Sequence, residues 1–353
     1  MSLMLDEIRQ QPGVLDRTLR EETAGAERLR KAIERRRPRL VILAARGTSD
    51  NAAQFGRYLL EISTGTPVSL AAPSIFTLYG ATVNFRDALV VAISQSGEST
   101  DTNIVLDRAK QQGAITVGIT NEPDSALARL AEHVFLVRAG RERSVAATKT
   151  YTGQLLMLYL LAWSMGAPIE LDDLRRIPAY ADAALKLEND IQSRASRYRF
   201  MDHAVVVGRG LNYANAFEFA LKLMETSYIV AERFSSADFL HGPIAMVGSS
   251  FPVFLFTPGG VTWSSTQQIL EKLRAAKAEM LVITDRSNPD ALNMGLRAVC
   301  INAQLNHAGP LPEEVFTPIP YIIPAQLFAV SLAGEKGLDP DSPRGLSKVT
   351  RTL

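Results

Sequence analysis

Cysteine is almost absent from this chain of 353 residues, which contains only Cys300. A single cysteine excludes a disulfide within the chain and a metal site built from several cysteines. The four histidines show none of the short spacings typical of metal ligands, such as H-E-x-x-H. We therefore expect no metal and no cofactor, and the scarcity of cysteine favours the reducing environment of the cytoplasm.

The chain also lacks an excess of either charge. Lys plus Arg number 38 and Asp plus Glu number 37, which leaves a net charge of +1. A nucleic-acid-binding protein usually carries a basic stripe, so we expect no nucleic-acid partner. The basic run before Pro38 is typical of a solvated helix end. A small anionic ligand is still compatible with this balance, because a few well-placed donors can hold one.

No hydrophobic run is long enough to span a membrane. The longest, Leu155 to Trp163, is about half of the ~20 residues that a span requires, and it predicts a buried core helix. The N-terminus carries Asp6 and Glu7 where a signal peptide would be apolar, so we expect neither export nor a membrane partner. With 46% hydrophobic and 21% charged residues, the chain can form about two domains with sizeable cores.

Apolar strands alternate with helical segments along the chain, which predicts an α/β fold with parallel sheets. An offset of 163 residues relates the two halves: it carries Arg46-Gly47 onto Arg209-Gly210, Ser94 onto Thr257 and Gly97 onto Gly260. A repeat this long indicates a duplicated domain. The predicted strands cover residues 40–45, 68–70, 88–93, 115–119 and 134–137, then 204–207, 253–256 and 280–283.

These patterns predict five parts. A helical segment (1–37) precedes a first domain (38–166), a helical connector (167–200) and a second domain (201–335), and a tail (336–353) follows. Each domain is expected to contain a parallel sheet with helices on both faces. Ligands of such sheets bind beyond the carboxyl ends of the strands, so the loops after the strands are the places to search for chemistry.

The loop Ser94-Gln95-Ser96-Gly97-Glu98-Ser99 lies between a predicted buried strand and a helix start. Helix N-terminal amides are unpaired donors with partial positive charge, and three hydroxyl groups add to them. A glycine allows the backbone to approach a ligand closely. The combination predicts a binding site for a phosphate monoester. Helix capping by Ser99 or Asp101 is the alternative, but it accounts for one residue only.

Other motifs of phosphate and acyl chemistry are missing. The Walker spacing is absent, Tyr213 replaces the third glycine of a dinucleotide fingerprint, and no G-x-S-x-G elbow occurs. Thr48 and Ser49 either cap the helix after the first strand or add donors to the site. Lys149 stands at a predicted helix start, where it binds a ligand or caps the helix.

Glu218, Lys222 and Glu225 recur at helical spacing after Gly210. Spacing alone favours a solvated helix face with an i, i+4 ion pair. His241 is followed by glycine and proline, which present its ring rigidly, and histidine titrates near neutral pH. It is a candidate acid–base group, although a structural or surface role is equally compatible with the sequence.

Taken together, these segments resemble the sugar isomerase (SIS) family, and more narrowly the isomerase half of glutamine–fructose-6-phosphate aminotransferase. The resemblance extends from about residue 40 to the end of the chain. It implies an α/β fold of two tandem SIS domains, each a three-layer α/β/α sandwich with a flavodoxin-like parallel sheet. Seven separated strings carry it: Arg46-Gly47-Thr48-Ser49, Ser94 to Ser99, Val145-Ala146-Ala147-Thr148-Lys149, Glu218-Phe219-Ala220-Leu221-Lys222, Glu225-Thr226-Ser227-Tyr228, His241-Gly242-Pro243 and Asp341 to Thr350.

The resemblance implies roles for these residues in binding. The residues that would bind the sugar phosphate are Ser49, Ser94, Gln95, Ser96 and Ser99. The family usually has Thr at the position of Ser99. Val145, Ala147 and Ser347 would contact the sugar, and the aminotransferase has Ser in place of Ala147. The C-terminal tail would close over the site.

The resemblance also implies catalytic roles. Glu225 would move a proton between the first two sugar carbons, and Lys222 would assist at the neighbouring oxygen. His241 would help to open the ring, reaching in from the neighbouring subunit of a homodimer. Lys348 would meet the substrate carbonyl, as a Schiff base in the aminotransferase. These residue types suit the reaction. An aldose–ketose proton transfer needs one positioned base, and a lysine amine can form an imine with a ketose.

The aminotransferase also carries a glutaminase with an N-terminal cysteine, and this sequence begins with Met1 and about 40 residues before the first strand. We therefore expect an SIS-type deaminase that converts glucosamine 6-phosphate to fructose 6-phosphate and ammonia. Two alternatives stay open. One is a deaminase or deglycase for another amino-sugar or fructosamine 6-phosphate, and the other is a non-catalytic sensor of phosphosugars.

Overall fold

Two compact, interleaved units make up the chain. The computed structural model describes residues 2–294, 297–346 and 348. The first lobe, as we call it, comprises residues 13–142, 149–176, 346 and 348, and the second lobe comprises residues 2–12, 143–148, 177–294 and 297–345. The domain boundaries drawn from the sequence above stay predictions.

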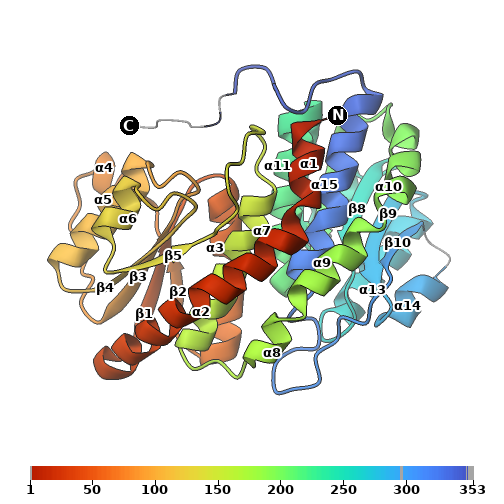
Figure 1. Cartoon of the computed structure of the whole chain (residues 1–353). Coiled ribbons are helices and arrows are strands. Elements are labelled where there is room, and N and C mark those ends of the chain that lie inside the picture. The colour runs from red at the N-terminus through yellow and green to blue at the C-terminus, as the bar shows by residue number, and fades with distance from the viewer. Residues whose placement is uncertain (1, 295–296, 347, 349–353) are drawn as a thin grey trace. The chain divides into compact units, whose positions relative to one another are not determined.

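The first lobe contains a five-stranded parallel sheet in the order β2-β1-β3-β4-β5. Helices α3 and α7 cover one face, and α4, α5 and α6 pack on the other (Figure 1). The elements are α2 (Gln11–Arg36), β1 (Leu40–Ala44), α3 (Thr48–Thr64), β2 (Val68–Leu70), α4 (Ser74–Thr77), β3 (Ala88–Ile93), α5 (Thr100–Gln111), β4 (Ile115–Thr120), α6 (Ala126–Leu130), β5 (His133–Leu136), α7 (Lys149–Ser164) and α8 (Leu171–Leu174).

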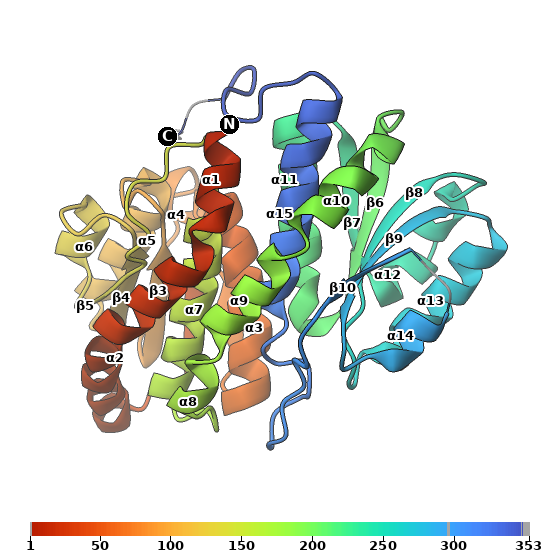
Figure 2. The same ribbon diagram turned by 45° about the vertical axis from the view of Figure 1, so that its right-hand side comes forward.

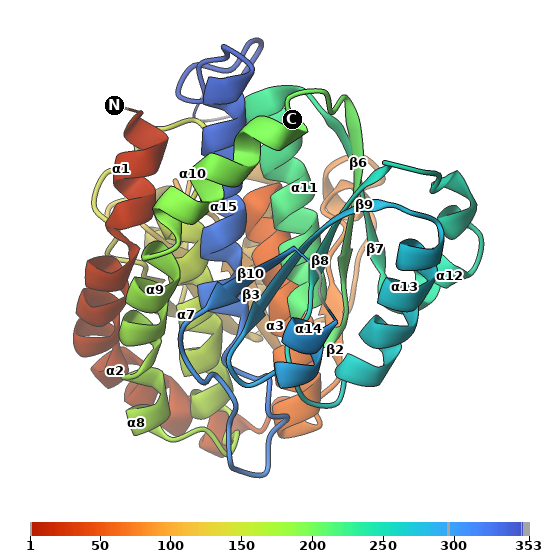
Figure 3. The ribbon, with the colours of Figure 1, turned by 90° about the vertical axis from the view of Figure 1, so that its right-hand side faces the viewer.

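The second lobe has its own parallel sheet in the order β7-β6-β8-β9-β10. Numbered along the chain within each lobe, both sheets have the order 2-1-3-4-5. Helices α11 and α15 pack on one face, with α12 and α13 on the other (Figure 3). The elements are α1 (Leu3–Arg9), α9 (Ile177–Leu185), α10 (Glu188–Ala195), η1 (Ser196–Tyr198), β6 (His203–Gly208), η2 (Gly210–Asn212), α11 (Tyr213–Ser227), β7 (Val230–Ser235), α12 (Ser236–Leu240), η3 (Pro243–Met246), β8 (Pro252–Phe256), α13 (Trp263–Ala275), β9 (Glu279–Asp285), α14 (Pro289–Asn293), β10 (Ala298–Ile301) and α15 (Pro318–Glu335).

The two sheets confirm the predicted tandem α/β fold with flavodoxin-like strand order. The repeat extends to backbone conformation. Gly47 and Gly210, which the 163-residue offset relates, both have φ +57° at the turn after the first strand of their sheet. Gly97 and Gly260 have φ +67° and +92° at the turn after the third. Glycine adopts this region at little steric cost, so the sequence echo reflects a shared local geometry.

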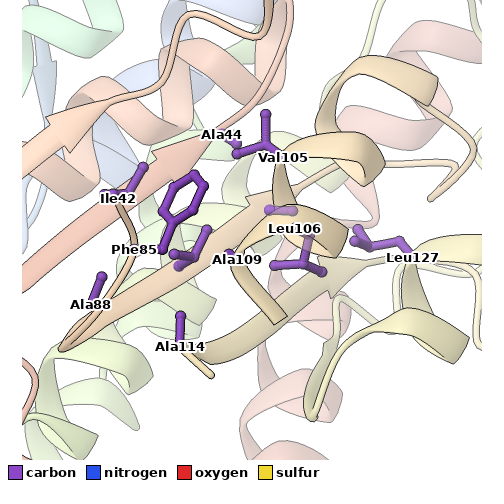
Figure 4. Close-up of a cluster of buried hydrophobic side chains, with 11 residues drawn as sticks. Ile42, Ala44, Phe85, Ala88, Val105, Leu106, Ala109, Ala114 and Leu127 are labelled. Carbon is purple, nitrogen blue, oxygen red and sulfur yellow. The ribbon is translucent and has the colours of Figure 1, made fainter. Parts of the chain in front are cut away.

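Continuous apolar strands are buried because helices cover both faces of each sheet. In the first lobe, Phe85 and side chains of β1 and β3 pack against α5 and α6 (Figure 4). In the second, Val205, Val253 and Val282 of neighbouring strands pack against Phe239 of α12 and Ile269 of α13. These cores fix the carboxyl ends of the strands, where the candidate loops begin.

Some elements differ from the sequence prediction. The N-terminal helical segment is divided into two helices, α1 and α2, with a break at Gln10. Pro12 has no N–H to donate to the carbonyl of Ile8, and the side-chain amide of Gln11 donates to that carbonyl instead at 3.0 Å. The sequence also did not reveal β7, β10 and α15. No helix in the described residues is both long and apolar enough to cross a membrane.

Candidate functional site

The serine-rich loop of the first lobe follows β3 and ends where α5 begins. The N–H of Gly97 donates to the hydroxyl oxygen of Ser94 at 3.1 Å, and the N–H of Glu98 donates to that of Ser96 at 3.3 Å. A Cβ atom on Gly97 would overlap the side chain of Ser125. The loop is therefore tightly wound, and glycine is required there both for the positive φ and for space.

Ser99 is the N-cap residue of α5, with extended backbone (φ −68°, ψ 111°), but its side chain makes no capping hydrogen bond within the described chain. Capping by this hydroxyl, the alternative considered from the sequence, is therefore wrong for Ser99. The carboxylate of Asp101, the other capping candidate, instead accepts a hydrogen bond from the guanidinium of Arg46 at 2.7 Å. The helix N-terminus retains amide donors of the kind that attract an anion.

Ser49 at the start of α3 and Lys149 at the start of α7 form hydrogen bonds with other groups of the first lobe. The hydroxyl oxygen of Ser49 accepts a hydrogen bond from the side-chain amide of Gln154 at 2.9 Å, which ties α3 to α7. The N-cap of α3 is Gly47, so neither Thr48 nor Ser49 is its N-cap residue. Lys149 is the first residue of α7, and its buried ammonium donates to the carbonyl of Arg141 at 2.9 Å.

A cleft of about 530 Å³ opens beside the serine-rich loop in the first lobe. Gln95 and Ser96 line one part of it, and Arg141, Glu142 and Lys348 line another. The cleft therefore joins two of the predicted phosphate-binding residues with the predicted carbonyl-binding lysine. Its volume lies within the range typical of small-ligand sites.

Glu142 is a residue of this cleft that the sequence analysis missed. Its side chain is fully buried, and one carboxylate oxygen accepts hydrogen bonds from Lys348 Nζ at 3.0 Å and from the Thr150 hydroxyl at 2.6 Å. The other oxygen accepts the backbone N–H of Thr150 at 3.2 Å. A buried carboxylate with these partners fixes the position of the lysine amine at the wall of the cleft. Ser347, the predicted neighbour of that lysine, lies outside the described residues.

In the second lobe, α11 brings three charged side chains together. Lys222 Nζ lies 3.3 Å from Glu218 Oε1 and 2.5 Å from Glu225 Oε2. The side chains of Glu218 and Lys222 are 0% exposed, and that of Glu225 is 21% exposed. The solvated helix face that spacing favoured is thus wrong, because this face of α11 is buried under α15 and the sheet.

Burial alone would lower the pKa of Lys222, but the carboxylates of Glu218 and Glu225 outweigh it and raise that pKa. The lysine therefore stays an ammonium between two carboxylates. Glu225 is the member of this group that a solute can reach. This is the arrangement expected of a positioned carboxylate base with a neighbouring donor for a developing oxyanion.

His241 ends α12 and is exposed to solvent. Its backbone N–H donates to Asp238 at 3.1 Å, and Gly242 follows with φ +134°, a conformation that glycine alone adopts readily. The turn therefore presents the imidazole outward from the second lobe. Within the described residues of this chain, the structure does not bring His241 together with the other predicted groups.

Val145 and Ala147 are half-buried in the segment 143–148 of the second lobe. Glu7 of α1 holds the start of this segment, since its buried carboxylate accepts the backbone N–H of Arg143 at 2.5 Å and of Ser144 at 3.2 Å. The N-terminal helix thus has a part in shaping a predicted substrate-binding segment, which nothing in its sequence indicated.

The chain's C-terminal segment is tied to the second lobe at two points. The carboxylate of Asp341 accepts the N–H groups of Leu3 at 2.7 Å and Met4 at 2.8 Å, so it caps α1, which lies beside α15 (Figure 2). The Arg344 guanidinium lies 4.1 Å from the ring centroid of Tyr228, the C-cap of α11, and the Arg344 N–H donates to the phenol oxygen at 2.9 Å.

Comparisons with known proteins agree with this architecture. The model of the SIS domain matches residues 35–164 and 199–335. The chain is 35% identical to a glutamine–fructose-6-phosphate aminotransferase of Methanothermobacter thermautotrophicus over 98% of its own length and 56% of that protein. It thus spans about half the length of the curated relatives it matches.

Solved structures give the same result. The C-terminal domain of glucosamine-fructose-6-phosphate aminotransferase from Francisella tularensis is 29% identical, with a TM-score of 0.86 over 97% of this chain and 98% of that one. A glucosamine-6-phosphate deaminase from Thermotoga maritima shares the fold at 22% identity, with a TM-score of 0.76 over 99% and 100% of the two chains. With both lobes matched by the family model, the resemblance inferred from the sequence is confirmed, and the chain belongs to the SIS domain family.

Proposed function

We propose that this chain is an SIS-type phosphosugar isomerase that deaminates an amino-sugar 6-phosphate, with glucosamine 6-phosphate giving fructose 6-phosphate and ammonia. The observation that carries the proposal is the cleft of the first lobe. One cavity of about 530 Å³ is lined there by Gln95 and Ser96 of the serine-rich loop and by Lys348. A sugar phosphate has an anion at one end and a carbonyl carbon at the other, so it suits both groups.

The proposed role of the loop is to bind the phosphate. Ser94, Ser96 and Ser99 supply hydroxyl groups, and the start of α5 supplies amide donors and a partial positive charge. Ser49, next to Gln154 on α7, belongs to the same proposed set. Gly97 keeps the loop compact enough for the backbone to reach the ligand.

The proposed role of Glu225 is to carry one proton. Its carboxylate removes the proton from C2 of the open-chain aldose, and the electron pair forms a C1–C2 double bond. The same proton returns to C1, which leaves a ketose imine at C2. Water then adds to C2 and ammonia leaves, so that amino sugar and water give ketose and ammonia. The ammonium of Lys222, 2.5 Å from Glu225, stabilises negative charge that develops on the neighbouring oxygen.

Two further groups complete the proposal. Lys348, positioned by Glu142, binds the carbonyl end of the sugar, and its amine is able to form an imine with the ketose. His241 opens the sugar ring, and we propose that it does so for the partner subunit of a homodimer in the cytoplasm. Its outward presentation from the second lobe supports this assignment.

The relatives support the same chemistry. The curated relatives are named as isomerizing aminotransferases of fructose 6-phosphate, and the Thermotoga maritima protein is named as a glucosamine-6-phosphate deaminase. Both names combine a hexose 6-phosphate with the transfer or the removal of an amino group. Deamination needs only water as the second substrate, and each of its steps has a proposed group among those named above.

The test is an assay of ammonia and fructose 6-phosphate from the purified chain, with glucosamine, galactosamine and fructosamine 6-phosphates as substrates. We expect turnover of glucosamine 6-phosphate, and no glucosamine 6-phosphate from fructose 6-phosphate and glutamine. Faster turnover of another of these sugar phosphates would change the proposed substrate but not the proposed reaction. Saturable binding without turnover of any member would contradict the proposed activity and favour a sensor.

Subunit exchange tests the homodimer. The variants His241→Ala and Glu225→Gln should each be inactive, and mixing them should restore part of the activity, because one site of the mixed dimer then has both groups intact. Size-exclusion chromatography of differently tagged subunits verifies that exchange has occurred. Exchanged dimers without activity would show that the two residues act within one chain.

A further inference from the structure

The loop after β8 is the second lobe's copy of the serine-rich loop. The 163-residue offset carries Ser94 onto Thr257, Gly97 onto Gly260 and Ser99 onto Thr262. Thr262 is the N-cap residue of α13, as Ser99 is of α5, and its side chain likewise makes no capping hydrogen bond within the described chain. The second copy has therefore kept the geometry of a helix N-terminus that attracts an anion.

A carboxylate of the chain itself occupies this position. Glu314, which follows the loop by 53 residues, accepts the backbone N–H of Val261 at its Oε2 atom, at 3.4 Å. Glu314 is 3% exposed. A Cβ atom on Gly260 would overlap the same oxygen, so the missing side chain makes room for the carboxylate. Burial raises the pKa of Glu314, and the hydrogen bond from Val261 acts in the opposite direction.

The second copy has also lost donors that the first copy retains. Pro258 stands where the first loop has Gln95 and has no N–H, and Gly259 stands at the position of Ser96 and has no hydroxyl. The hydroxyl of Thr257 donates to the carbonyl of Ile283 at 3.1 Å, within the sheet. These changes would weaken binding of an external phosphate, but a single carboxylate needs fewer donors.

We propose that Glu314 is a built-in anion that closes the second lobe's loop to phosphate. The chain then binds a phosphosugar through the first loop alone, and removal of the carboxylate uncovers a second phosphate site at the start of α13. This inference holds for any phosphosugar and any reaction at the first loop. Its test therefore gives the same answer whether or not the chain is a deaminase.

The test compares three proteins: the wild type, Glu314→Ala and Glu314→Gln. Thermal unfolding of each is followed in inorganic phosphate and in sodium chloride of equal ionic strength. The chloride series corrects for screening, and the wild type corrects for phosphate bound at the first loop. Glu314→Gln is the matched control, because its amide fills the same space without the charge.

We expect both variants to unfold at lower temperature than the wild type in chloride. Phosphate at ten times the Kd of the uncovered site should raise the Tm of Glu314→Ala by about 3 °C more than that of the wild type. Glu314→Gln should show no such excess. The proposal is overturned if phosphate raises the Tm of Glu314→Ala no more than that of the wild type. It is also overturned if phosphate raises the Tm of Glu314→Gln as much as that of Glu314→Ala.

Refolding gives an independent measurement if Glu314→Ala does not fold without phosphate. The yield of refolded protein after dilution from urea is then measured in phosphate and in chloride. A yield that rises with phosphate for Glu314→Ala, but not for Glu314→Gln, supports the built-in anion. Equal yields of Glu314→Ala in the two salts contradict it.

Discussion

Lys222 and Glu225 form an ion pair of 2.5 Å on α11, and they differ sharply in exposure: the lysine side chain is 0% exposed and the glutamate side chain is 21% exposed. The lysine is therefore held by the protein, whereas the glutamate offers a carboxylate edge to a solute. This difference favours Glu225 over Glu218 for the proposed proton transfer, because the side chain of Glu218 is also 0% exposed.

Replacement of Glu225 tests that assignment. Glu225→Gln should lower kcat by about 10²–10⁴-fold, the usual range for loss of a general base, with little change in the affinity for the phosphosugar. Glu232→Gln, an exposed glutamate of β7, is the matched control and should leave kcat unchanged. Normal turnover of Glu225→Gln would remove this residue from the mechanism.

The buried ion pairs of Lys222 have a consequence for stability. Lys222→Met removes the ammonium that lies between the two carboxylates, and Glu218 has no access to water. We expect the free energy of unfolding to fall by about 3–5 kcal/mol, measured by urea denaturation. The double variant Glu218→Gln/Lys222→Met should recover part of this loss. An equal loss in the double variant would show that packing of the lysine chain, not charge, is responsible.

Glu142 should act as a positioning residue for Lys348. Glu142→Gln removes the charge that holds the amine at 3.0 Å, and we expect kcat to fall by about 10–100-fold through misplacement of that amine. Glu122→Gln, an exposed glutamate lining the same cleft, should have little effect.

The readout that separates positioning from a purely structural role is covalent trapping. Borohydride reduction in the presence of fructose 6-phosphate should modify Lys348 in the wild type, as detected by peptide mass spectrometry. Trapping should be slower in Glu142→Gln at an unchanged Tm. Equal trapping rates in the two proteins would show that Glu142 does not position the amine.

Gly97 should be needed for more than its backbone conformation. In Gly97→Ala, an alanine must adopt the left-handed backbone conformation, which lowers the stability by about 1–2 kcal/mol. Its methyl group also overlaps the side chain of Ser125. We expect lower stability together with weaker binding of sugar phosphates, measured by calorimetry. Gly113→Ala is the matched control, because Gly113 has φ +79° but open space at its Cβ position. A Gly97→Ala protein with normal affinity would contradict the proposed loop site.

Acid should weaken one ion-pair cluster of the second lobe. Arg197 donates to Glu279 at 2.9 and 2.8 Å, Arg297 donates to it as well, and these hydrogen bonds lower the pKa of Glu279 to about 2. Since the folded pKa lies below the unfolded value, the stabilisation is complete above about pH 5 and is lost as the pH falls toward 2. Glu279→Gln should cost about 1 kcal/mol at pH 7, because water screens the exposed arginines.

Urea denaturation at several pH values measures that difference. The stability gap between the wild type and Glu279→Gln should be constant from pH 7 to pH 5 and should narrow at pH 4 and pH 3. A gap that is the same at all of these pH values would show that the carboxylate charge is not the source of the stabilisation.

Most of the fold could be predicted because buried parallel strands are continuous apolar runs. β7 was missed because it contains Glu232 and Arg233, both exposed, and α15 was missed because Pro320 and Pro324 interrupt a run that is apolar on all sides. Proline at these positions is typical of loops, and tertiary packing overrides that preference here.

The candidate site could be predicted only where its signal is local. The serine-rich loop is one contiguous motif, so its composition was informative. The contacts of Glu142 with Lys348 and of Glu314 with Val261 join residues 206 and 53 positions apart, and no spacing rule links them. Burial of Glu218 and Lys222 was also invisible, because an i, i+4 pair has the same pattern on a surface helix.

The capping of α1 by Asp341 bears on the order in which the chain is made. Synthesis starts at the N-terminus, but the partner of Leu3 and Met4 lies 338 and 337 residues further on, near the C-terminus. The α15 helix on which α1 packs is also made late. The α1 helix therefore cannot complete its cap until 338 further residues have been synthesised, and a slow ribosome leaves its apolar face exposed for longer.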